Sequence, residues 1–223
     1  MRKLFFIFTC SICFFLISCG GDIKVSIYTR DLSDIASAKE KVIYTNVNMI
    51  VESLDDENDI NFLRNNLNGF SNEHQVEYNY STSLSFDIKI PILMENTDID
   101  SSKDLLILIG RKNGNKVDFY LKYNKPLFSK IDNYIFNAHY QNIDLKEFNL
   151  KFDVNNDERK SISFTTYSSY VNGKAYPFEH SELLKERDRF SFEVSEIFSK
   201  YISEMSENSF PLFSILWNYV LKE

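Results

Sequence analysis

Few side chains in this sequence have the types and spacing needed for acid–base or nucleophilic catalysis. The histidines are only three: His74 in a polar turn, His139 near a predicted helix end and His180 after a predicted strand. No serine occupies a G-x-S-x-G turn, the setting that exposes a nucleophile beside a histidine base. We therefore predict no catalytic residues, and we expect surface or capping roles for the histidines.

The acidic residues form an incomplete calcium pattern. Asp153, Asn155 and Asp157 have the spacing of a calcium-binding loop. However, Glu158 stands where that loop requires glycine, and Phe164 stands where it requires a bidentate glutamate. A solvated loop is therefore the expected structure.

Two further segments carry potential metal ligands. The acidic run 98–104 has Lys103 at the turn of a calcium loop, and Glu179, His180 and Glu182 are close in sequence. Neighbours in an extended chain point to opposite faces, and no H-E-x-x-H pattern is present. We predict no metal site and no cofactor, and weak calcium binding by the acidic loops stays open.

The cysteines all lie near the N-terminus. After Met1-Arg2-Lys3, residues 4–18 form the uncharged apolar run LFFIFTCSICFFLIS. This layout is typical of a secretory signal peptide, and the run is shorter than the roughly 20 residues that a membrane-spanning helix needs. Cys10 and Cys13 lie inside the run, so their C-x-x-C spacing would leave with the signal peptide instead of serving redox chemistry.

The residues around Cys19 resemble the lipobox of bacterial lipoproteins. Leu16 stands three positions before the cysteine, the small Ser18 directly before it and Gly20 directly after it. The resemblance implies that a diacylglycerol is attached to Cys19, that residues 1–18 are removed, and that the new amino group is usually acylated. Two or more acyl chains would anchor the protein stably to a membrane without crossing it.

The resemblance also implies a location in the bacterial cell envelope. Gly20 is not the aspartate that typically retains such lipoproteins in the inner membrane of Gram-negative bacteria, so we expect the outer membrane, facing the periplasm. The alternative is an ordinary signal peptidase that cuts after Ser18-Cys19-Gly20 and releases a soluble protein beginning at Gly21.

Composition restricts the partners and the fold. Loss of Arg2 and Lys3 with the signal peptide lowers the formal net charge from −7 to −9, a poor match for nucleic acid. The chain has 20 Phe and 13 Tyr against 6 Gly and 4 Pro, which favours strands and a packed core over disorder. Only Cys19 remains after processing, so we expect no disulfide.

Hydrophobic periodicity predicts a single exported domain over residues 23–223, behind a lipid attachment and short tether at 19–22. Asn113-Gly114 and Asn172-Gly173 predict hairpin turns. The predicted strands cover 23–32, 41–53, 75–80, 84–94, 105–110, 116–123, 147–154, 160–171 and 174–179, and the predicted helices cover 55–70, 126–138, 194–205 and 213–220.

These elements predict an α+β domain, in which two C-terminal helices pack on one face of a mainly antiparallel sheet. In the second of these helices, Phe213 and Trp217 belong to an apolar stripe that docks on the sheet or faces a partner or the membrane interface.

The chain is also rich in tyrosines that fall within predicted strands, and two interpretations of them stay open. Tyrosines exposed on strands can bind glycans or extended peptides, or these residues belong to the core and to half-exposed faces of the sheet. The tyrosines concerned are Tyr78, Tyr80, Tyr167 and Tyr170.

The sequence therefore predicts a membrane-anchored envelope lipoprotein with a non-catalytic binding or assembly role. Its expected partners are the membrane, through the lipid on Cys19, and an envelope protein or glycan. Two alternatives stay open: a tethered hydrolase that uses paired carboxylates, and a purely structural surface lipoprotein. Beyond the lipobox, the segment DIKVSIYTRDL, residues 22–32, resembles the start of uncharacterised bacterial lipoproteins.

Overall fold

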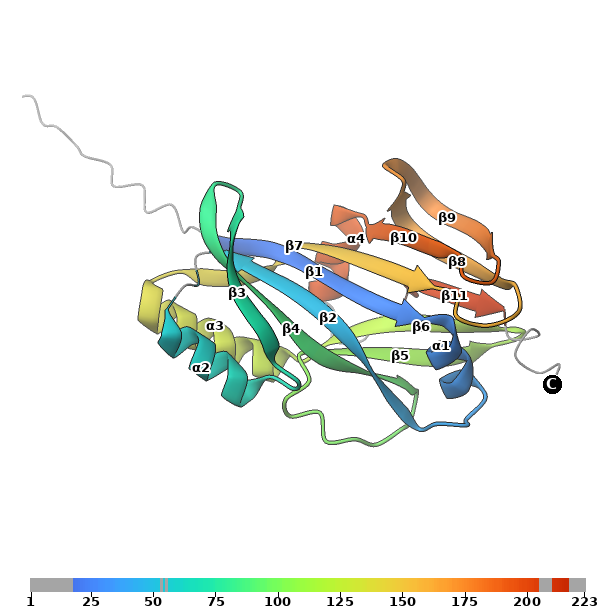
Figure 1. Cartoon of the computed structure of the whole chain (residues 1–223), viewed down its shortest axis with the longest axis horizontal. Coiled ribbons are helices and arrows are strands. Elements are labelled where there is room, and N and C mark those ends of the chain that lie inside the picture. Colours follow the sequence, from blue (N-terminus) through green and yellow to red (C-terminus); the bar gives the residue numbers. More distant parts are fainter. Residues whose placement is uncertain (1–17, 53, 55, 205–209, 217–223) are drawn as a thin grey trace, which may run out of the picture.

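A computed structural model describes residues 18–216 except 53, 55 and 205–209, and within them one sheet is combined with four short helices (Figure 1). The strands are β1 (Ser18–Tyr28), β2 (Val42–Glu52), β3 (Ser71–Tyr78), β4 (Ser81–Met94), β5 (Leu106–Asn113), β6 (Lys116–Tyr123), β7 (Asn142–Asn155), β8 (Ile162–Val171), β9 (Lys174–Leu184), β10 (Arg189–Val194) and β11 (Phe213–Leu216). The helices are α1 (Thr29–Ala36), α2 (Glu57–Asn66), α3 (Lys125–His139) and α4 (Glu196–Glu204).

The sheet closes on itself. Its hydrogen-bonded order is β10-β7-β1-β2-β4-β5-β6-β11-β8-β9, and β10 also pairs with β8, which joins the two halves of the path. Strand β3 pairs with β4 outside this path. The pairs β1–β7 and β4–β5 are parallel and the other described pairs are antiparallel, so the sheet is mixed. In a closed sheet, alternate side chains of every strand turn inward and fill the interior.

Phenylalanine rings fill part of this interior. The ring centroid of Phe213 lies 5.0 Å from that of Phe119 and 4.9 Å from that of Phe164. Phe152 and Phe192 stack at 5.0 Å, and all five side chains are buried. Because rings at this spacing gain stacking energy beyond their buried area, the short strand β11 is held firmly between β6 and β8.

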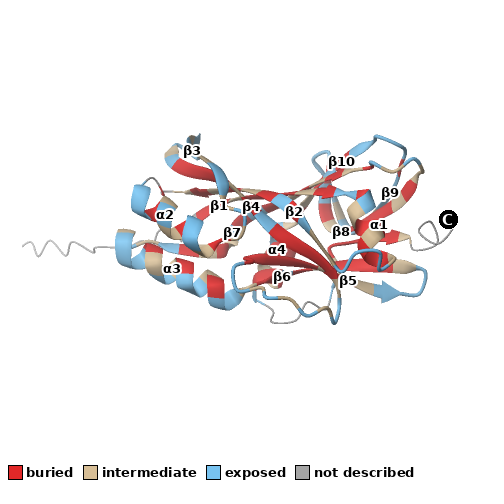
Figure 2. Ribbon diagram, turned by 60° about the horizontal axis from the view of Figure 1, so that its bottom comes forward, coloured by how far each residue is buried: buried red, intermediate tan, exposed pale blue. Residues whose placement is uncertain are grey.

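The helices cover openings and edges of the sheet. Helix α1 buries Leu32 and Ile35 against the strands near it, and α4 packs against β7. Helices α2 and α3 lie together, with the rings of Phe62 and Tyr134 stacked at 3.8 Å. Figure 2 shows buried residues along the strands and exposed residues on the outer faces of α2 and α3. No helix in the described part of the chain is both long and apolar enough to span a membrane.

The predicted fold class is wrong. Strand residues outnumber helical residues by more than two to one, the sheet is mixed, and no pair of C-terminal helices covers one face. Residues 213–216 form β11, because Phe213 and Ile215 both turn inward and the segment pairs with β6 and β8. Tertiary pairing therefore outweighs the helical spacing of the apolar residues; Trp217, which shared that stripe, lies outside the described residues.

The first strand begins at Ser18, before the predicted start at Ile23, so the expected tether at 20–22 lies within β1. Two buried glycines permit this. A Cβ atom at Gly21 would lie 1.8 Å from the carbonyl oxygen of Ile50, and one at Gly20 would lie 2.8 Å from that of Glu147. Close backbone approach therefore fixes glycine at both positions.

Candidate functional site

An apolar groove of about 870 Å³ lies between β9, β6 and α4. Three of its large side chains are strongly exposed: Phe178 by 83%, Ile197 by 84% and Phe210 by 59%. A contiguous exposed apolar patch of this kind typically marks an interaction site. The groove is lined by Tyr120, Tyr167, Pro177, Phe178, Ile197, Phe198, Tyr201, Phe210 and Pro211, with Asn113, Lys116, Asp118, Ser168 and Glu179 among them.

A bulge explains why Phe178 points outward. The β8–β9 ladder shifts its register at Ser168, which has a left-handed φ of 44°, and Pro177 and Phe178 occupy the unmatched positions of β9. Bulges re-aim side chains, and Pro177 has no N–H to donate to a ladder. Phe178 therefore projects from the strand instead of joining the core.

The floor of the apolar groove has polar atoms that are already engaged. The guanidinium of Arg111 lies 4.5 Å from the ring centroid of Tyr120, and Asn113 donates to Asp118 at 2.8 Å. Burial, followed by the charge of Asp118, raises the pKa of Tyr120. The hydroxyls of Tyr167 and Ser214 are 3.1 Å apart. The groove thus offers mainly apolar contact area.

A second groove, of about 610 Å³, is polar and crosses the outer faces of β1, β7 and β10. Lys24 binds Asp153 at 2.8 Å, and Lys151 binds Asp22 at 2.9 Å. Burial opposes the charge on Asp22, but hydrogen bonds from Asn149, Lys151 and the Tyr78 hydroxyl outweigh it and hold its pKa below the usual value.

Burial and hydrogen bonds also shift the pKa values of Asp153, which lines this groove, and of Tyr78, which donates to Asp22. Burial raises the pKa of Asp153, but hydrogen bonds from Lys24 and Ser191 and the charge of Lys24 bring it below its usual value. Burial and the hydrogen bond to Asp22 raise the pKa of Tyr78 to about 12. These carboxylates are therefore stabilised as anions, whereas a general acid in glycoside hydrolysis needs a raised pKa.

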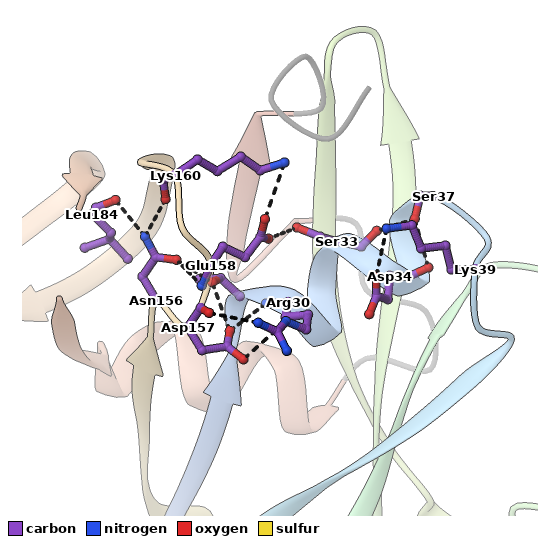
Figure 3. A network of polar contacts seen from close by, with 11 residues as sticks. Arg30, Ser33, Asp34, Ser37, Lys39, Asn156, Asp157, Glu158, Lys160 and Leu184 are labelled. Carbon is purple, nitrogen blue, oxygen red and sulfur yellow. Dashed lines mark hydrogen bonds and ion pairs between the residues drawn. The ribbon is translucent and has the colours of Figure 1, made fainter. Parts of the chain in front are cut away.

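A third polar cluster joins α1 to the loop between β7 and β8 (Figure 3). The backbone N–H and guanidinium of Arg30 bind Asp157, and Ser33 donates to Glu158. Burial, then the charges of Asp157 and Asp34, raises the pKa of Asp31. Asp31 thus combines a raised pKa with a neighbouring carboxylate, yet neither groove includes it.

The segment with calcium-like spacing is not one solvated loop, because Asp153 and Asn155 lie in strand β7 and only Asp157 lies in the loop that follows. Asp153 is bound by Lys24 and Ser191, and Asp157 is bound by Arg30. The carboxylates of Asp153 and Asp157 are thus bound by donors from other elements. Among the described residues, no group of three or more His, Cys, Asp or Glu side chains is arranged to hold a metal ion.

The histidines lie on different elements. His74 is exposed on β3, with its Nδ1 2.8 Å from the carbonyl oxygen of Asn72. His139 places Nε2 2.8 Å from the buried carboxylate of Asp59, which ties α3 to α2. The Nε2 atom of His180 lies 3.1 Å from the carboxylate of Glu182, two residues further along β9.

The tyrosines predicted to bind partners divide between structural and exposed positions. Tyr78 is held by Asp22, and Tyr167 by Ser214. Tyr170 is 43% exposed and lines the polar groove, whereas Tyr80 is fully exposed at a hairpin turn.

The predicted lipidation residue, Cys19, has its backbone in β1, paired with Ile143 of β7. Sequence reasoning missed the apolar groove. Ile197 lies in the helix predicted at 194–205, which was expected to pack on the sheet, and nothing in the spacing around Phe178 indicated the bulge that exposes it. The signal that existed was Pro177, since proline inside a strand marks an edge or a bulge. In chemical terms, the apolar groove offers exposed apolar area for contact, and the polar groove offers carboxylates that are paired with lysines.

The chain was compared with models of known protein families. The model of a family described as a domain of unknown function (DUF7424) matches residues 21–215. Searches of curated proteins and of solved structures gave no match.

Proposed function

The chain belongs to the DUF7424 family, and from its own sequence and surface we propose that it is a bacterial envelope lipoprotein with a binding role. Lipid on Cys19 anchors the domain to the outer membrane, on its periplasmic side. The apolar groove then receives an apolar segment of a protein partner, and the domain catalyses no reaction. The observation that carries the binding role is the exposure of Phe178, Ile197 and Phe210 around one groove.

The start of β1 supports the anchor. Pairing of β1 with β7 includes the backbone of Cys19, and the N–H of Gly20 donates to Glu52 at 3.3 Å. Cleavage before Cys19 keeps these contacts, whereas cleavage after Gly20 removes them. Because Cys19 already lies in β1, no linker separates the proposed anchor residue from the sheet, and the domain is held close to the bilayer.

The chemistry of the groove favours a protein partner over a glycan. Glycan recognition uses polar groups that fix hydroxyls, while the large exposed side chains here are apolar. Pro177 also interrupts the hydrogen-bonding edge of β9, which disfavours strand addition at that point. Side-chain burial is the remaining source of affinity, and it suits an apolar helix or loop of a protein.

The hydrolase alternative finds less support. The carboxylates of the polar groove, Asp22 and Asp153, have lowered pKa values and lysine partners. Asp31 has a raised pKa, but its neighbour Asp157 is bound by Arg30 and lies outside both grooves. The described side chains therefore support a binding role better than acid–base hydrolysis.

Membrane fractionation tests the anchor. Cys19→Ser should move the folded protein from the membrane fraction to the soluble fraction. Cys13→Ser is the matched control, because that thiol lies inside the predicted signal peptide and should leave the anchor intact. Continued membrane association of a normally cleaved Cys19→Ser protein would contradict lipid attachment at this residue.

Site-specific photo-crosslinking tests the groove. A photoreactive side chain at position 178 should label a polypeptide in cells, and an Ile197→Asp substitution should abolish that label while leaving the protein membrane-bound. The control position is Tyr28, which is 46% exposed and outside the groove. Equal labelling from positions 178 and 28, or labelling of a glycan alone, would contradict a protein partner at the groove.

A further inference from the structure

Two exposed tyrosines occupy backbone positions where glycine is normally preferred. In the β3–β4 turn, Asn79 and Tyr80 have φ values of 48° and 64°. The β8–β9 turn has the same left-handed pair, with φ of 51° at Asn172 and 74° at Gly173. Left-handed backbone costs a residue with a Cβ atom more than it costs glycine. Tyr80 therefore stands where this chain elsewhere uses glycine, and its side chain is 100% exposed.

Tyr140 repeats this feature at the end of α3. It has a φ of 58°, and its N–H donates to the carbonyl oxygen of Phe136 at 2.8 Å, which closes the helix. Glycine is the usual residue at such a left-handed helix end. The Tyr140 side chain is 84% exposed, and its ring lies 6.5 Å from that of Phe136, itself 44% exposed.

These aromatic residues lie on both sides of the start of β1. The carboxylate of Glu52 accepts from the N–H of Gly20 at 3.3 Å and from the side chain of Asn79 at 2.8 Å, so it connects the strand start to the Tyr80 turn. On the other side, Ile143 follows Tyr140 by three residues and pairs with Cys19, the first residue of the proposed mature chain. Figure 1 places the β3–β4 hairpin, the end of α3 and the start of β1 at one end of the molecule.

We propose that Tyr80, Phe136 and Tyr140, together called the aromatic end, sit in the headgroup region of the membrane that carries the lipid anchor. The inference rests on the proposed lipidation of Cys19 and adds an orientation to it. Tyrosine suits this region because its ring is apolar and its hydroxyl is polar. Because the chain has an acidic net charge, anionic lipid would not attract it, and we expect zwitterionic lipid to be sufficient for contact with the aromatic end.

This contact would fix the orientation of the domain, with its aromatic end at the bilayer surface and its other end away from it. Three contacts, at the lipid, at the Tyr80 turn and at the end of α3, fix its tilt better than one flexible tether. Strand β9, which carries Phe178, lies at the opposite end of the molecule in Figures 1 and 2. The aromatic end would thus direct the apolar groove away from the bilayer surface.

Quenching by brominated lipid tests this orientation. The lipidated protein is placed in vesicles of brominated phosphatidylcholine, with Tyr80→Trp or Tyr140→Trp as the reporter in a Trp217→Phe background, because Trp217 is the chain's only tryptophan. Tyr44→Trp is the control, since position 44 is 44% exposed and lies eight residues along β2 from Glu52, about 26 Å at the usual rise of a strand. We expect quenching at 80 and 140 to exceed that at 44 several-fold.

The outcomes separate this inference from the anchor. Lipidated protein whose reporters at 80 and 140 are quenched no more than the reporter at 44 overturns the aromatic end but leaves the anchor standing. Mass spectra without lipid on Cys19 overturn both. A Tyr80→Gly, Tyr140→Gly protein should keep its fold and lipid, while a Phe136→Trp reporter in it should lose at least half of its quenching; undiminished quenching would contradict the role of the two tyrosines.

Discussion

Four individual residues have a backbone conformation or a buried polar group that lowers the stability of the fold. Tyr80 and Tyr140 accept left-handed backbone, Tyr123 buries its hydroxyl, and Asp104 buries its carboxylate. Within the described residues, the Tyr123 hydroxyl and one Asp104 oxygen have no hydrogen-bond partner. Residues that break local rules at a cost often serve function, and the two tyrosines at the proposed membrane end are placed for it. The Tyr123 hydroxyl and the Asp104 carboxylate are not at a proposed functional site, so we expect that replacing them will stabilise the protein.

Tyr123→Phe should raise the free energy of unfolding by about 1 kcal/mol, because it keeps the buried ring and removes a hydroxyl that has no partner among the described residues. Urea denaturation measures the change. Tyr167→Phe is the control: its hydroxyl lies 3.1 Å from that of Ser214, so its loss should destabilise by about 1 kcal/mol. Equal losses in both variants would mean that Tyr123 has a partner.

Asp104→Asn should stabilise the protein more at pH 7 than at pH 3. Burial, reinforced by the charge of Asp100, raises the pKa of Asp104 in the folded state above its ordinary value of 3.8, although a hydrogen bond from Asn68 partly offsets this. The folded state therefore holds this proton more tightly, and stability falls as pH rises from about 4 through the folded pKa. Asparagine removes that penalty and keeps an acceptor for Asn68.

The matched control for this pH dependence is Asp22→Asn. Hydrogen bonds lower the pKa of Asp22 despite its burial, so its carboxylate stabilises the fold above pH 3.8 and loses this effect as pH falls through the folded pKa. The variant should therefore be destabilised at pH 7 and approach the parent at low pH. Parallel pH profiles for the two asparagine variants, measured by urea denaturation, would contradict both assignments.

At the scale of elements, sequence reasoning succeeded where local signals were strong. The predicted helices at 55–70, 126–138 and 194–205 are confirmed as α2, α3 and α4, since each combines an amphipathic stripe with capping signals or a break beyond it. Their ends are less accurate: α2 stops at Asn66, four residues before the predicted end at residue 70, and Gly69 lies in the turn that follows. Both Asn-Gly hairpin turns are confirmed at β5–β6 and β8–β9.

Elements that depend on distant partners could not be predicted. Strand β11 exists because β6 and β8 accept it, and α1 forms where the sequence continued a strand. The apolar groove combines three separate regions of the chain with a bulge in β9, so no local pattern contains it. The proposed lipid attachment at Cys19 stays a prediction, and it rests on a motif that is entirely local.

Gly21→Ala should destabilise the protein by about 3 kcal/mol, because its Cβ would lie 1.8 Å from a backbone oxygen of β2 that cannot move alone. Thermal or urea unfolding of the Cys19→Ser protein measures this. Gly114→Ala is the control: its Cβ meets no atom within 4 Å, so only the left-handed φ of 60° should cost about 1 kcal/mol. A Gly21→Ala protein as stable as its parent would contradict the pairing at the start of β1.

At the scale of the whole molecule, one closed sheet connects the proposed anchor with the apolar groove. The proposed mature chain has Cys19 as its single cysteine, so we expect its stability to come from the core and from closure of the sheet. Residues 20–216 of the Cys19→Ser protein should therefore unfold in a single calorimetric transition, unchanged by reductant. Two separated transitions would mean that the β1–β7 half and the β6–β8 half are independent domains.

Lipid anchoring at Cys19 is tested by the intact mass of the mature protein purified from its membrane. We expect a chain that begins at Cys19 and carries a diacylglycerol on that thiol, with an additional acyl group on the new amino terminus. A mature chain that begins with unmodified Gly21 would contradict it, because both the anchor and the first pairs of β1 would then be absent.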